Sequence, residues 1–333
     1  MEYVFDYLIF LAKAVTIIVA LVLIIVAAGA RRGQHRPPEG RIQVVRINDR
    51  LRALRSAVRH AMTPVTRRRK LTREENREAK RERKTESDRS RVFVVNFKGD
   101  FMASQLDCLR NEITAILTSA RENDEVVVRI ESPGGVVHGY GLAASQLVRV
   151  KEKGIRLVAA IDKVAASGGY MMASVADRIV TAPFAIVGSI GVVAQLPNVH
   201  RFLKKRDIDV ELMTAGEHKR TLTVLGQNTD SGRAKFQEEI EDVHALFKSF
   251  VVDHRPDVDV EAVATGEAWY GQRAIERKLV DELCTSDEYL VDACDDKDVF
   301  EVRWIPPEKP IERLLRQFST AMHDVIDRVL GRL

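Results

Sequence analysis

Residues 162–173 read Asp-Lys-Val-Ala-Ala-Ser-Gly-Gly-Tyr-Met-Met-Ala. This stretch places Ser167 between alanines and glycines, so its hydroxyl has little steric cover and a large acyl group can reach it. The two glycines that follow let the backbone approach a ligand closely, and their N–H groups can face a developing oxyanion. The same pattern is also typical of a tight turn before a helix. The stretches around it distinguish a simple turn from a reactive serine.

Strands and helices alternate on both sides of this stretch. We expect buried strands over 92–97, Glu125–Glu131 and 155–161, which are rich in apolar residues. Helices are predicted over 139–153 and 166–177. Further predicted elements are strands at 178–182, 190–194 and 207–213, and helices at 199–205, 230–252, 271–277 and 286–293. Such alternation predicts an α/β fold with a largely parallel sheet.

Charge is distributed unevenly along the 333 residues. Residues 31–91 contain 21 Lys and Arg against 8 Asp and Glu, whereas residues 92–333 contain 30 against 38. We therefore predict a basic linker at 31–91, a packed domain at 92–300, and a C-terminal strand and amphipathic helix at 301–333. No aromatic residue interleaves the basic ones in 66–91. This favours a solvated helix or a disordered tether there over nucleic-acid binding.

Residues 8–30 are nearly all apolar, interrupted only by Lys13, Thr16 and Gly29. This run reaches the roughly 20 residues that a bilayer requires. The residues before it carry Glu2 and Asp6 rather than the basic charge of a cleavable signal peptide. We therefore predict a transmembrane anchor within 1–30. Six arginines in the twenty residues after the run place the main domain in the cytoplasm by the positive-inside rule.

Two amphipathic patterns lie near the ends of the chain. In 42–62 one apolar stripe is surrounded by arginines, and it consists of Ile47, Leu51, Leu54, Val58 and Met62. Two occupants fit this stripe, anionic lipid and the main domain, and the sequence does not separate them. A second stripe at 311–329 is expected to pack on its own domain, with an oligomer interface or the membrane as alternatives.

Other stretches supply groups that a serine nucleophile needs. Ser132-Pro133-Gly134-Gly135 follows a predicted central strand, at the edge where parallel sheets expose backbone N–H groups. One of these N–H groups and that of Gly168 can form an oxyanion hole. Of the eight histidines, only His138 lies beside the glycine-rich stretches, so Lys219 is the alternative base. A lysine base must be neutral, which requires its pKa to fall by several units.

Four motifs occur in one order. They are Ser-Pro-Gly-Gly at 132–135, Ala-Ser-Gly-Gly-Tyr at 166–170, Gly-Ser-Ile-Gly-Val at 188–192 and Gly-Glu-His-Lys at 216–219. Together they resemble the signal peptide peptidase A family of serine–lysine peptidases (peptidase family S49), and the layout of the chain is similar to short, membrane-anchored members. The resemblance implies a ClpP/crotonase-like fold, a spiral of ββα units around a parallel sheet.

The resemblance also implies a role for each matching residue. Ser167 matches the nucleophile and Lys219 the general base. Ser189 matches the serine that orients the lysine amine, and the N–H groups of Gly134 and Gly168 match the oxyanion hole. The segment from Trp269 to Asp281 matches a structural signature of the family. A single copy of the domain implies a homo-oligomer, in which Ser167 and Lys219 can come from one subunit or from neighbouring ones.

The predicted function is that of a membrane-anchored serine endopeptidase of the bacterial inner membrane. It would hydrolyse hydrophobic peptides or membrane-protein fragments without a metal or an organic cofactor. Family members often face the outer side of the membrane, against the arginine count here. Two alternatives stay open: a crotonase-type acyl-transfer enzyme and a non-catalytic oligomeric membrane scaffold. Cys108, Cys284 and Cys294 show no metal-ligand spacing and predict no disulfide framework.

Overall fold

The computed structural model describes residues 5–7, 9–13, 16, 40–85, 89–216 and 218–307. One compact unit comprises residues 42–304, and a second comprises the two chain ends. The first unit extends beyond the predicted domain 92–300 in both directions. Among the described residues, no helix is both long enough and apolar enough to cross a membrane. Most of the predicted anchor at 8–30, and all of the predicted helix at 311–329, lie outside the described residues.

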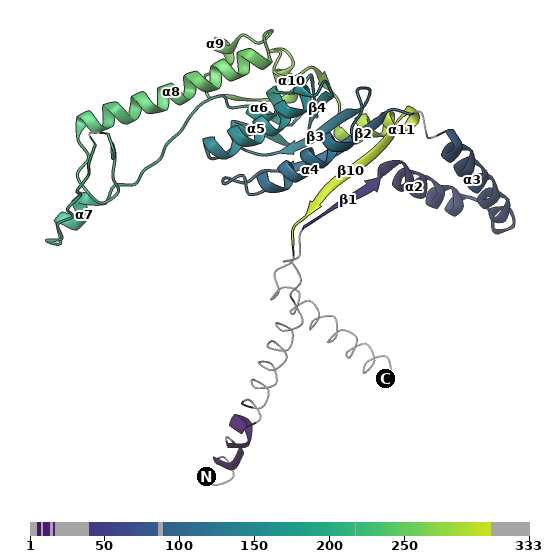
Figure 1. The fold of residues 1–333 in the computed structure, drawn as a ribbon, viewed down its shortest axis with the longest axis horizontal. Helices are drawn as coiled ribbons and strands as arrows, with labels where there is room; N and C mark the ends of the chain where they lie inside the picture. Colours follow the sequence, from purple (N-terminus) through teal and green to yellow (C-terminus); the bar gives the residue numbers. More distant parts are fainter. Residues whose placement is uncertain are drawn as a thin grey trace. The chain divides into compact units, whose positions relative to one another are not determined.

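A parallel sheet forms the centre of the larger unit (Figure 1). In spatial order its strands, as far as the structure describes the chain, are β1 (Arg41–Arg46), β10 (Asp298–Ile305), β2 (Arg91–Lys98), β3 (Glu125–Glu131), β4 (Arg156–Ile161), β6 (Arg178–Thr181) and β9 (Glu282–Leu283). Each pair from β10 to β9 is parallel. The predicted α/β fold with a parallel sheet is confirmed.

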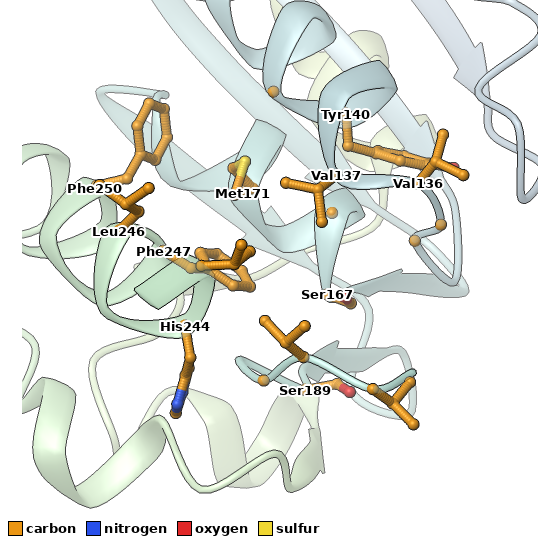
Figure 2. Close-up of a pocket in the computed structure, with 18 of the residues that line it drawn as sticks. Val136, Val137, Tyr140, Ser167, Met171, Ser189, His244, Leu246, Phe247 and Phe250 are labelled. Carbon is orange, nitrogen blue, oxygen red and sulfur yellow. The ribbon is translucent and has the colours of Figure 1, made fainter. Parts of the chain in front are cut away.

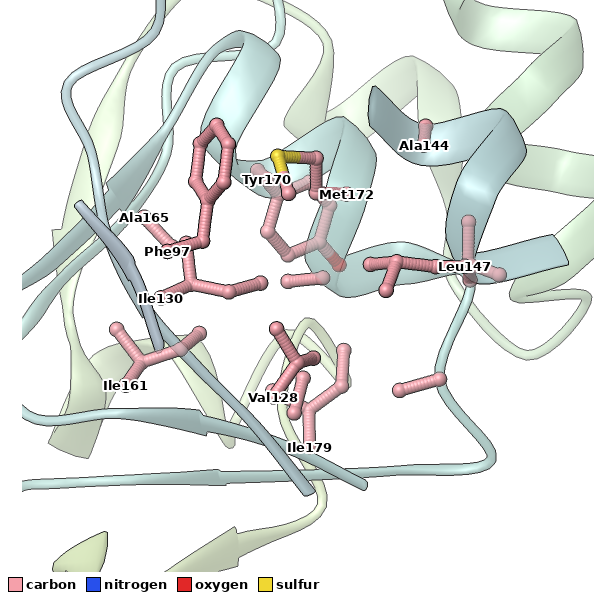
Figure 3. Packing of buried hydrophobic residues seen from close by; sticks show 14 of the residues in the cluster. Phe97, Val128, Ile130, Ala144, Leu147, Ile161, Ala165, Tyr170, Met172 and Ile179 are labelled. Atoms are coloured by element: carbon pink, nitrogen blue, oxygen red, sulfur yellow. The ribbon is translucent and has the colours of Figure 1, made fainter. Parts of the chain in front are cut away.

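Alternate residues of the central strands enter two different hydrophobic cores. On β2, Phe93, Val95 and Phe97 belong to a large core, whereas Val92 and Val94 belong to a smaller one. The large core is covered by α4 (Leu106–Ser119), α5 (Val137–Glu152) and α6 (Gly168–Ser174). Figure 3 shows Leu147 of α5 and Met172 of α6 in this core. The smaller core is covered by α11 (Ser286–Asp296) and by Ile47. Because both faces are buried, the strands read as continuous apolar runs in the sequence.

A second, smaller sheet carries the serine motifs. It consists of β5 (Val164–Ala166), β7 (Ile186–Gly188) and β8 (Ala268–Tyr270), with β5 and β7 parallel and β7 and β8 antiparallel. A bridge between Ser132 and Ala165 joins this sheet to the end of β3. The small sheet therefore starts where the central strand of the main sheet ends.

The predicted C-terminal signature supports the main sheet from one side. The Asp281 carboxylate accepts hydrogen bonds from the Ile179 backbone at 2.7 Å and from Arg255 Nη2 at 2.6 Å. The buried Tyr170 hydroxyl donates to the Leu279 carbonyl at 3.0 Å. These bonds connect α6, β6 and the end of α8 (Asp230–His254). The short helices α9 (Val260–Val263) and α10 (Gly271–Ala274) follow α8 in the chain.

The N-terminal basic segment is ordered as two helices, α2 (Ile47–Met62) and α3 (Val65–Thr85). The helix predicted over 42–62 therefore begins later than expected. Residues 41–46 form β1 instead, because they pair with β10 at the edge of the main sheet. Of the two forms predicted for 66–91, a solvated helix and a tether, most of this segment adopts the helix.

Two predicted strands are wrong. Residues 190–194 and 207–213 form no strand, and the strand in the first region is β7, which ends at Gly188. Ser189 has a φ of 53°, which turns the chain out of the small sheet before Ile190. Residues 193–220, here called the arm, contain α7 (His200–Lys204) and are largely exposed where described. Apolar alternation in the arm has no neighbouring strand, in the part of the chain that the structure describes, with which to pair.

Candidate active site

Ser167 occupies a sharp turn between β5 and α6. Its backbone has φ 51° and ψ −119°, a conformation that L-residues rarely adopt and that costs free energy. The turn is held on both sides, because the Ser167 N–H donates to the Gly188 carbonyl at 2.7 Å and its carbonyl accepts from the Met171 N–H at 2.9 Å. A strained strand-to-helix turn of this kind presents a serine hydroxyl for attack in hydrolases.

Ser189 lies beside Ser167 because of the register between β5 and β7. Ala166 pairs with Gly188 in this parallel pair, so the residues that follow them, Ser167 and Ser189, leave the sheet side by side. Both have positive φ, and the Ser189 N–H donates to the Glu267 carbonyl at 2.7 Å. Figure 2 shows the two serines on the same side of the pocket.

The Pro-Gly-Gly loop lies against Ser167. The Ser132 N–H donates to the Val164 carbonyl at 2.8 Å, and the Ala166 N–H donates back to the Ser132 carbonyl at 3.0 Å. Gly134 has a φ of 89°, and a Cβ added there would lie 2.7 Å from Ser167 Cβ and 2.8 Å from the Gly168 nitrogen. Only glycine fits this position. The predicted residues Gly134, Ser167, Gly168 and Ser189 are thus brought together.

Tyr140 supports this loop from behind. Its hydroxyl lies 2.6 Å from Ser132 Oγ and donates to the Asp100 carbonyl at 2.7 Å. Ser132 Oγ in turn accepts the Gly134 N–H at 3.1 Å. Burial raises the pKa of Tyr140, so the hydroxyl keeps its proton and acts as a donor. The Tyr140 ring also fills the space that a side chain at Gly168 would need.

An apolar pocket of about 1330 Å³ opens beside Ser167. Its walls come from the loop after β3, from α6, from the residues after β7 and from α8 (Figure 2). Its apolar lining includes Val136, Val137, Met171, Val193, Leu246, Phe247 and Phe250. A pocket of this composition accommodates hydrophobic side chains next to the serine hydroxyl.

Lys219 is not among the residues that line this pocket. It is exposed on the arm, where its N–H donates to the Gly216 carbonyl at 3.2 Å. Two histidines do line the pocket, His138 from α5 and His244 from α8. The Nε2 atom of His244 is buried and has no hydrogen-bond partner among the described residues. Within this chain, the fourth sequence motif is therefore separate from the other three.

Metal-binding and thiol chemistry have no centre in the described part of the chain. No group of three or more His, Cys, Asp or Glu residues there is placed to hold a metal ion. Cys108, Cys284 and Cys294 are free. Burial raises the pKa of Cys284 and of Cys294 to about 11, so both thiols are protonated at neutral pH.

The contribution of α8 to the pocket was not predicted from the sequence. Val243, Leu246, Phe247 and Phe250 recur at helical spacing, which indicates an apolar face but not what that face covers. The hydrogen bond between Ser132 and Tyr140 was not predicted either. A tyrosine eight residues after a serine carries no signal by itself, because the intervening loop decides whether the two meet.

Comparison with known proteins adds the following similarities. The pattern described as peptidase family S49 matches residues 149–299, and that described as peptidase family S49 N-terminal matches residues 2–147. The "Probable protease SohB" of Haemophilus influenzae is 56% identical over 237 residues, which cover 71% of this chain and 67% of the relative. The protein of the same description from Buchnera aphidicola subsp. Acyrthosiphon pisum is 51% identical, covering 73% and 72%.

Among solved structures, the chain is similar to a "1510-N membrane-bound stomatin-specific protease" variant in complex with a substrate peptide. The identity is 11%, the TM-score is 0.42, and the similarity covers 70% of this chain and 99% of that one.

Proposed function

Because the chain belongs to peptidase family S49, we propose that it is a serine endopeptidase in which Ser167 is the nucleophile and Lys219 the general base. The observation that carries this proposal is the position of Ser167. It occupies a strained turn at an apolar pocket, beside Ser189 and against Gly134. A serine hydroxyl that opens onto a pocket next to backbone donors is what acyl transfer to a serine requires.

In the proposed reaction, Ser167 Oγ attacks the carbonyl carbon of a peptide bond while its proton passes to neutral Lys219 Nζ. The carbonyl oxygen becomes an oxyanion that accepts hydrogen bonds from the Gly134 and Gly168 N–H groups. When the C–N bond breaks, the leaving amine takes the proton from Lys219. A water molecule then attacks the acyl-enzyme, with Lys219 again accepting the proton. As the bond to Ser167 Oγ breaks, Lys219 returns that proton to Ser167 and the acid product leaves. Ser189 orients the Lys219 amine.

The hydrogen bond from the Gly134 N–H to Ser132 Oγ affects this assignment. In the resting site the donor is already used by a neutral oxygen at 3.1 Å. An oxyanion is a stronger acceptor than a hydroxyl, so it can take over the Gly134 N–H as charge develops. Ser132 then serves to hold the loop in place before substrate binds, with Tyr140 fixing its hydroxyl.

We propose hydrophobic peptides or membrane-protein fragments as substrates. The apolar lining of the pocket supports this, since Val137, Met171 and Phe247 offer no charged group to a substrate side chain. Family membership favours peptide hydrolysis over the crotonase-type acyl transfer considered from the sequence.

The exposed position of Lys219 leads us to propose a homo-oligomer in which Lys219 of one subunit completes the site of its neighbour. The arm that carries Lys219 exposes large apolar residues, among them Phe202, Leu212 and Met213. Such residues are normally covered when they are this numerous on one segment. A neighbouring copy would cover them and bring the lysine to Ser167.

We also propose that residues 8–30 anchor the enzyme in the bacterial inner membrane, with the catalytic domain on the cytoplasmic side. The uniform apolar run and the six arginines that follow it support this arrangement. The chain is expected to remain in the membrane fraction after alkaline carbonate washing. Its release into the supernatant would contradict the anchor, whereas access of an external thiol reagent to the catalytic domain would contradict only the side.

The nucleophile can be tested with a fluorophosphonate probe and intact-mass measurement of the full chain. Wild-type protein should gain the mass of one probe, and Ser167→Ala should gain none because the attacking oxygen is gone. Ser189→Ala is the matched control, since it removes a neighbouring serine with the same backbone conformation. We expect that variant to be labelled, more slowly than wild type.

Labelling that disappears in Ser189→Ala and persists in Ser167→Ala would exchange the two roles. A wild-type chain that reacts with no serine probe would instead favour a non-catalytic membrane scaffold. Hydrolysis of a hydrophobic peptide should fall on the order of a thousandfold or more in Ser167→Ala, as for other serine nucleophiles.

A further inference from the structure

Helix α2 presents its apolar stripe to solvent. Ile47 packs on the smaller core and Leu51 is half-buried, but the stripe continues beyond the domain. Leu54, Val58 and Met62 are 58%, 60% and 80% exposed. The main domain therefore covers Ile47 and part of Leu51, and it leaves the rest of the stripe open. Of the two partners that the sequence allows for the stripe, the main domain accounts only for its first residues.

The helix that packs on α2 covers the opposite side. Glu75 of α3 accepts a hydrogen bond from Ser56 Oγ at 2.9 Å and lies 3.2 Å from His60 Nε2. Ser56 and His60 project from the polar face of α2, roughly opposite the stripe at 3.6 residues per turn. The hairpin of α2 and α3 thus pairs polar faces and leaves an apolar face open. Burying the polar face alone gives little stability, so the apolar face is expected to have another partner.

The surroundings of the stripe are strongly basic. Residues 47–85 contain 14 Lys and Arg against 5 Asp and Glu. At helical spacing, Arg50 borders the stripe on one side, and Arg55 and Arg59 border it on the other. All three are exposed, and none forms an ion pair with a residue that the structure describes. Apolar residues flanked by uncompensated arginines are the pattern of a helix that lies in the headgroup region of an anionic bilayer.

We propose that the stripe Leu54, Val58 and Met62 inserts into the surface of an anionic phospholipid bilayer, with Arg50, Arg55 and Arg59 contacting the phosphate groups. Charge complementarity selects lipid over a second copy of this chain, because two copies would bring the same arginines together. Such docking would hold the main sheet and its pocket at a membrane surface, because α2 follows directly after β1, the edge strand of that sheet.

The test places an environment-sensitive nitrobenzoxadiazole label at Val58→Cys in the full chain. The matched control carries the label at Ala53→Cys, an exposed position on the side of α2 away from the stripe. The chain is reconstituted into vesicles of phosphatidylcholine alone and into vesicles that also contain phosphatidylglycerol. Both contain a phospholipid with a nitroxide on its acyl chain, which quenches labels that enter the bilayer. Labelled unsubstituted chain gives the background from the native cysteines.

We expect the Val58 label to shift to the blue and to be quenched in the anionic vesicles, and the Ala53 label to do neither. Replacing Arg50, Arg55 and Arg59 by Gln should remove most of the quenching. Each arginine that is replaced is expected to lower the partition of the stripe onto the anionic surface about fivefold, and added salt should lower it as well. These side chains are exposed, so the triple variant should fold, which circular dichroism checks. Any capture of the chain by residues 8–30 is common to both vesicle types.

Three results would overturn the proposal. A blue shift without quenching means that protein, such as a second copy, covers the stripe. No shift in either vesicle means that the stripe stays in water. Equal quenching at Val58 and Ala53, or in vesicles without phosphatidylglycerol, means that the contact with lipid involves neither this face nor its arginines.

Discussion

At the scale of single residues, the site depends on two serines held in an unfavourable backbone conformation. Ser167 and Ser189 each have a φ near 50°, which costs about 1–3 kcal/mol per residue. Each is held by a hydrogen bond of 2.7 Å from its N–H to a neighbouring carbonyl, Gly188 for Ser167 and Glu267 for Ser189. The strained conformation directs both side chains out of the small sheet toward the pocket. With an ordinary strand conformation at these positions, the chain would continue past the pocket.

Gly134→Ala should disable the site while most of the fold survives. The added Cβ would lie 2.7 Å from Ser167 Cβ and would have to be tolerated at a φ of 89°, so the loop must move and take its N–H away from the oxyanion position. Loss of one such donor lowers turnover about 100-fold to 1000-fold. The rate of fluorophosphonate labelling measures the effect.

The control for this substitution is Gly141→Ala. Gly141 lines the same pocket, but an added Cβ there meets no atom within 4 Å. Alanine is also a better helix former than glycine, so this variant of α5 should be as stable as wild type or more so, and should react at the wild-type rate. Equal reactivity of the Gly134 and Gly141 variants would remove Gly134 from the oxyanion hole.

At the scale of elements, two neighbouring carboxylates, on α4 and β10, have pKa values that the fold shifts in opposite directions. Glu112 of α4 is buried, and its Oε1 accepts the Trp304 N–H at 2.7 Å. Burial raises the pKa of Glu112, and the charge of Glu301 adds to the rise. Burial also acts on Glu301, but hydrogen bonds from Arg303 at 2.7 Å and Asn96 at 2.6 Å outweigh it and lower the pKa of Glu301.

The two corresponding glutamine variants should therefore change stability in opposite directions. Above the ordinary pKa of a glutamate, Glu112 destabilises the folded state because its charged form is disfavoured there. Glu112→Gln should raise the free energy of unfolding at neutral pH by about 1 kcal/mol. Glu301→Gln should lower it by about 1–3 kcal/mol, because hydrogen bonds to a charged group are lost. Urea denaturation at several pH values measures both.

The pH dependence follows from the direction of each shift. The stability that protonated Glu112 contributes to the fold is complete below the pKa of Glu112 in the unfolded chain. It is lost as pH rises through the higher pKa in the folded chain. The contribution of charged Glu301 is complete above its unfolded pKa and is lost as pH falls through the lower folded pKa. Both differences from wild type should therefore shrink in acid. A Glu112→Gln variant less stable than wild type at neutral pH would contradict the account of its burial.

At the scale of the whole molecule, the pocket and the proposed base lie on different parts of the chain. The pocket is lined by residues of α5, α6 and α8 and by loop residues that include Ser167 and Ser189, whereas Lys219 lies on the exposed arm and does not line it. An enzyme whose site is completed between subunits would not be fully active as a monomer.

Mixing two inactive chains tests this arrangement. Ser167→Ala lacks the nucleophile, and Lys219→Arg lacks a base because a guanidinium cannot lose its proton in a protein. If neighbouring subunits share the site, co-expressed variants should recover roughly a quarter of wild-type peptidase activity, since a quarter of the sites combine an intact Ser167 with an intact Lys219. Activity is measured on the purified mixed oligomer.

Two outcomes contradict the proposal in different ways. A mixture as inactive as either variant alone would place both residues in one subunit. Near-normal activity of Lys219→Arg by itself would exclude Lys219 as the base. His138 and His244, which line the pocket, would then be the candidates to replace it, together with His218 beside Lys219.

The local pattern of apolar and polar residues was sufficient to predict much of the fold. The continuous apolar runs of β2, β3 and β4 and the helical spacing of α5 and α8 predicted these elements with close boundaries, because burial on both faces of a parallel sheet leaves a direct mark on composition. Small residues around Ser167 likewise predicted an accessible serine before the start of α6. The roles of Ser167 and Lys219 in catalysis stay predictions.

Tertiary structure decided what depends on residues distant in sequence. The pairing of Ala166 with Gly188 places Ser189 beside Ser167, and no local pattern contains that register. Residues 190–194 and 207–213 have strand-like composition but no partner strand among the described residues, so no ladder of backbone hydrogen bonds holds them extended. The stripe on α2 was visible in the sequence, yet only the packing of α3 on the opposite face showed that it is open. Periodicity identifies an apolar face, whereas the three-dimensional arrangement determines what covers it.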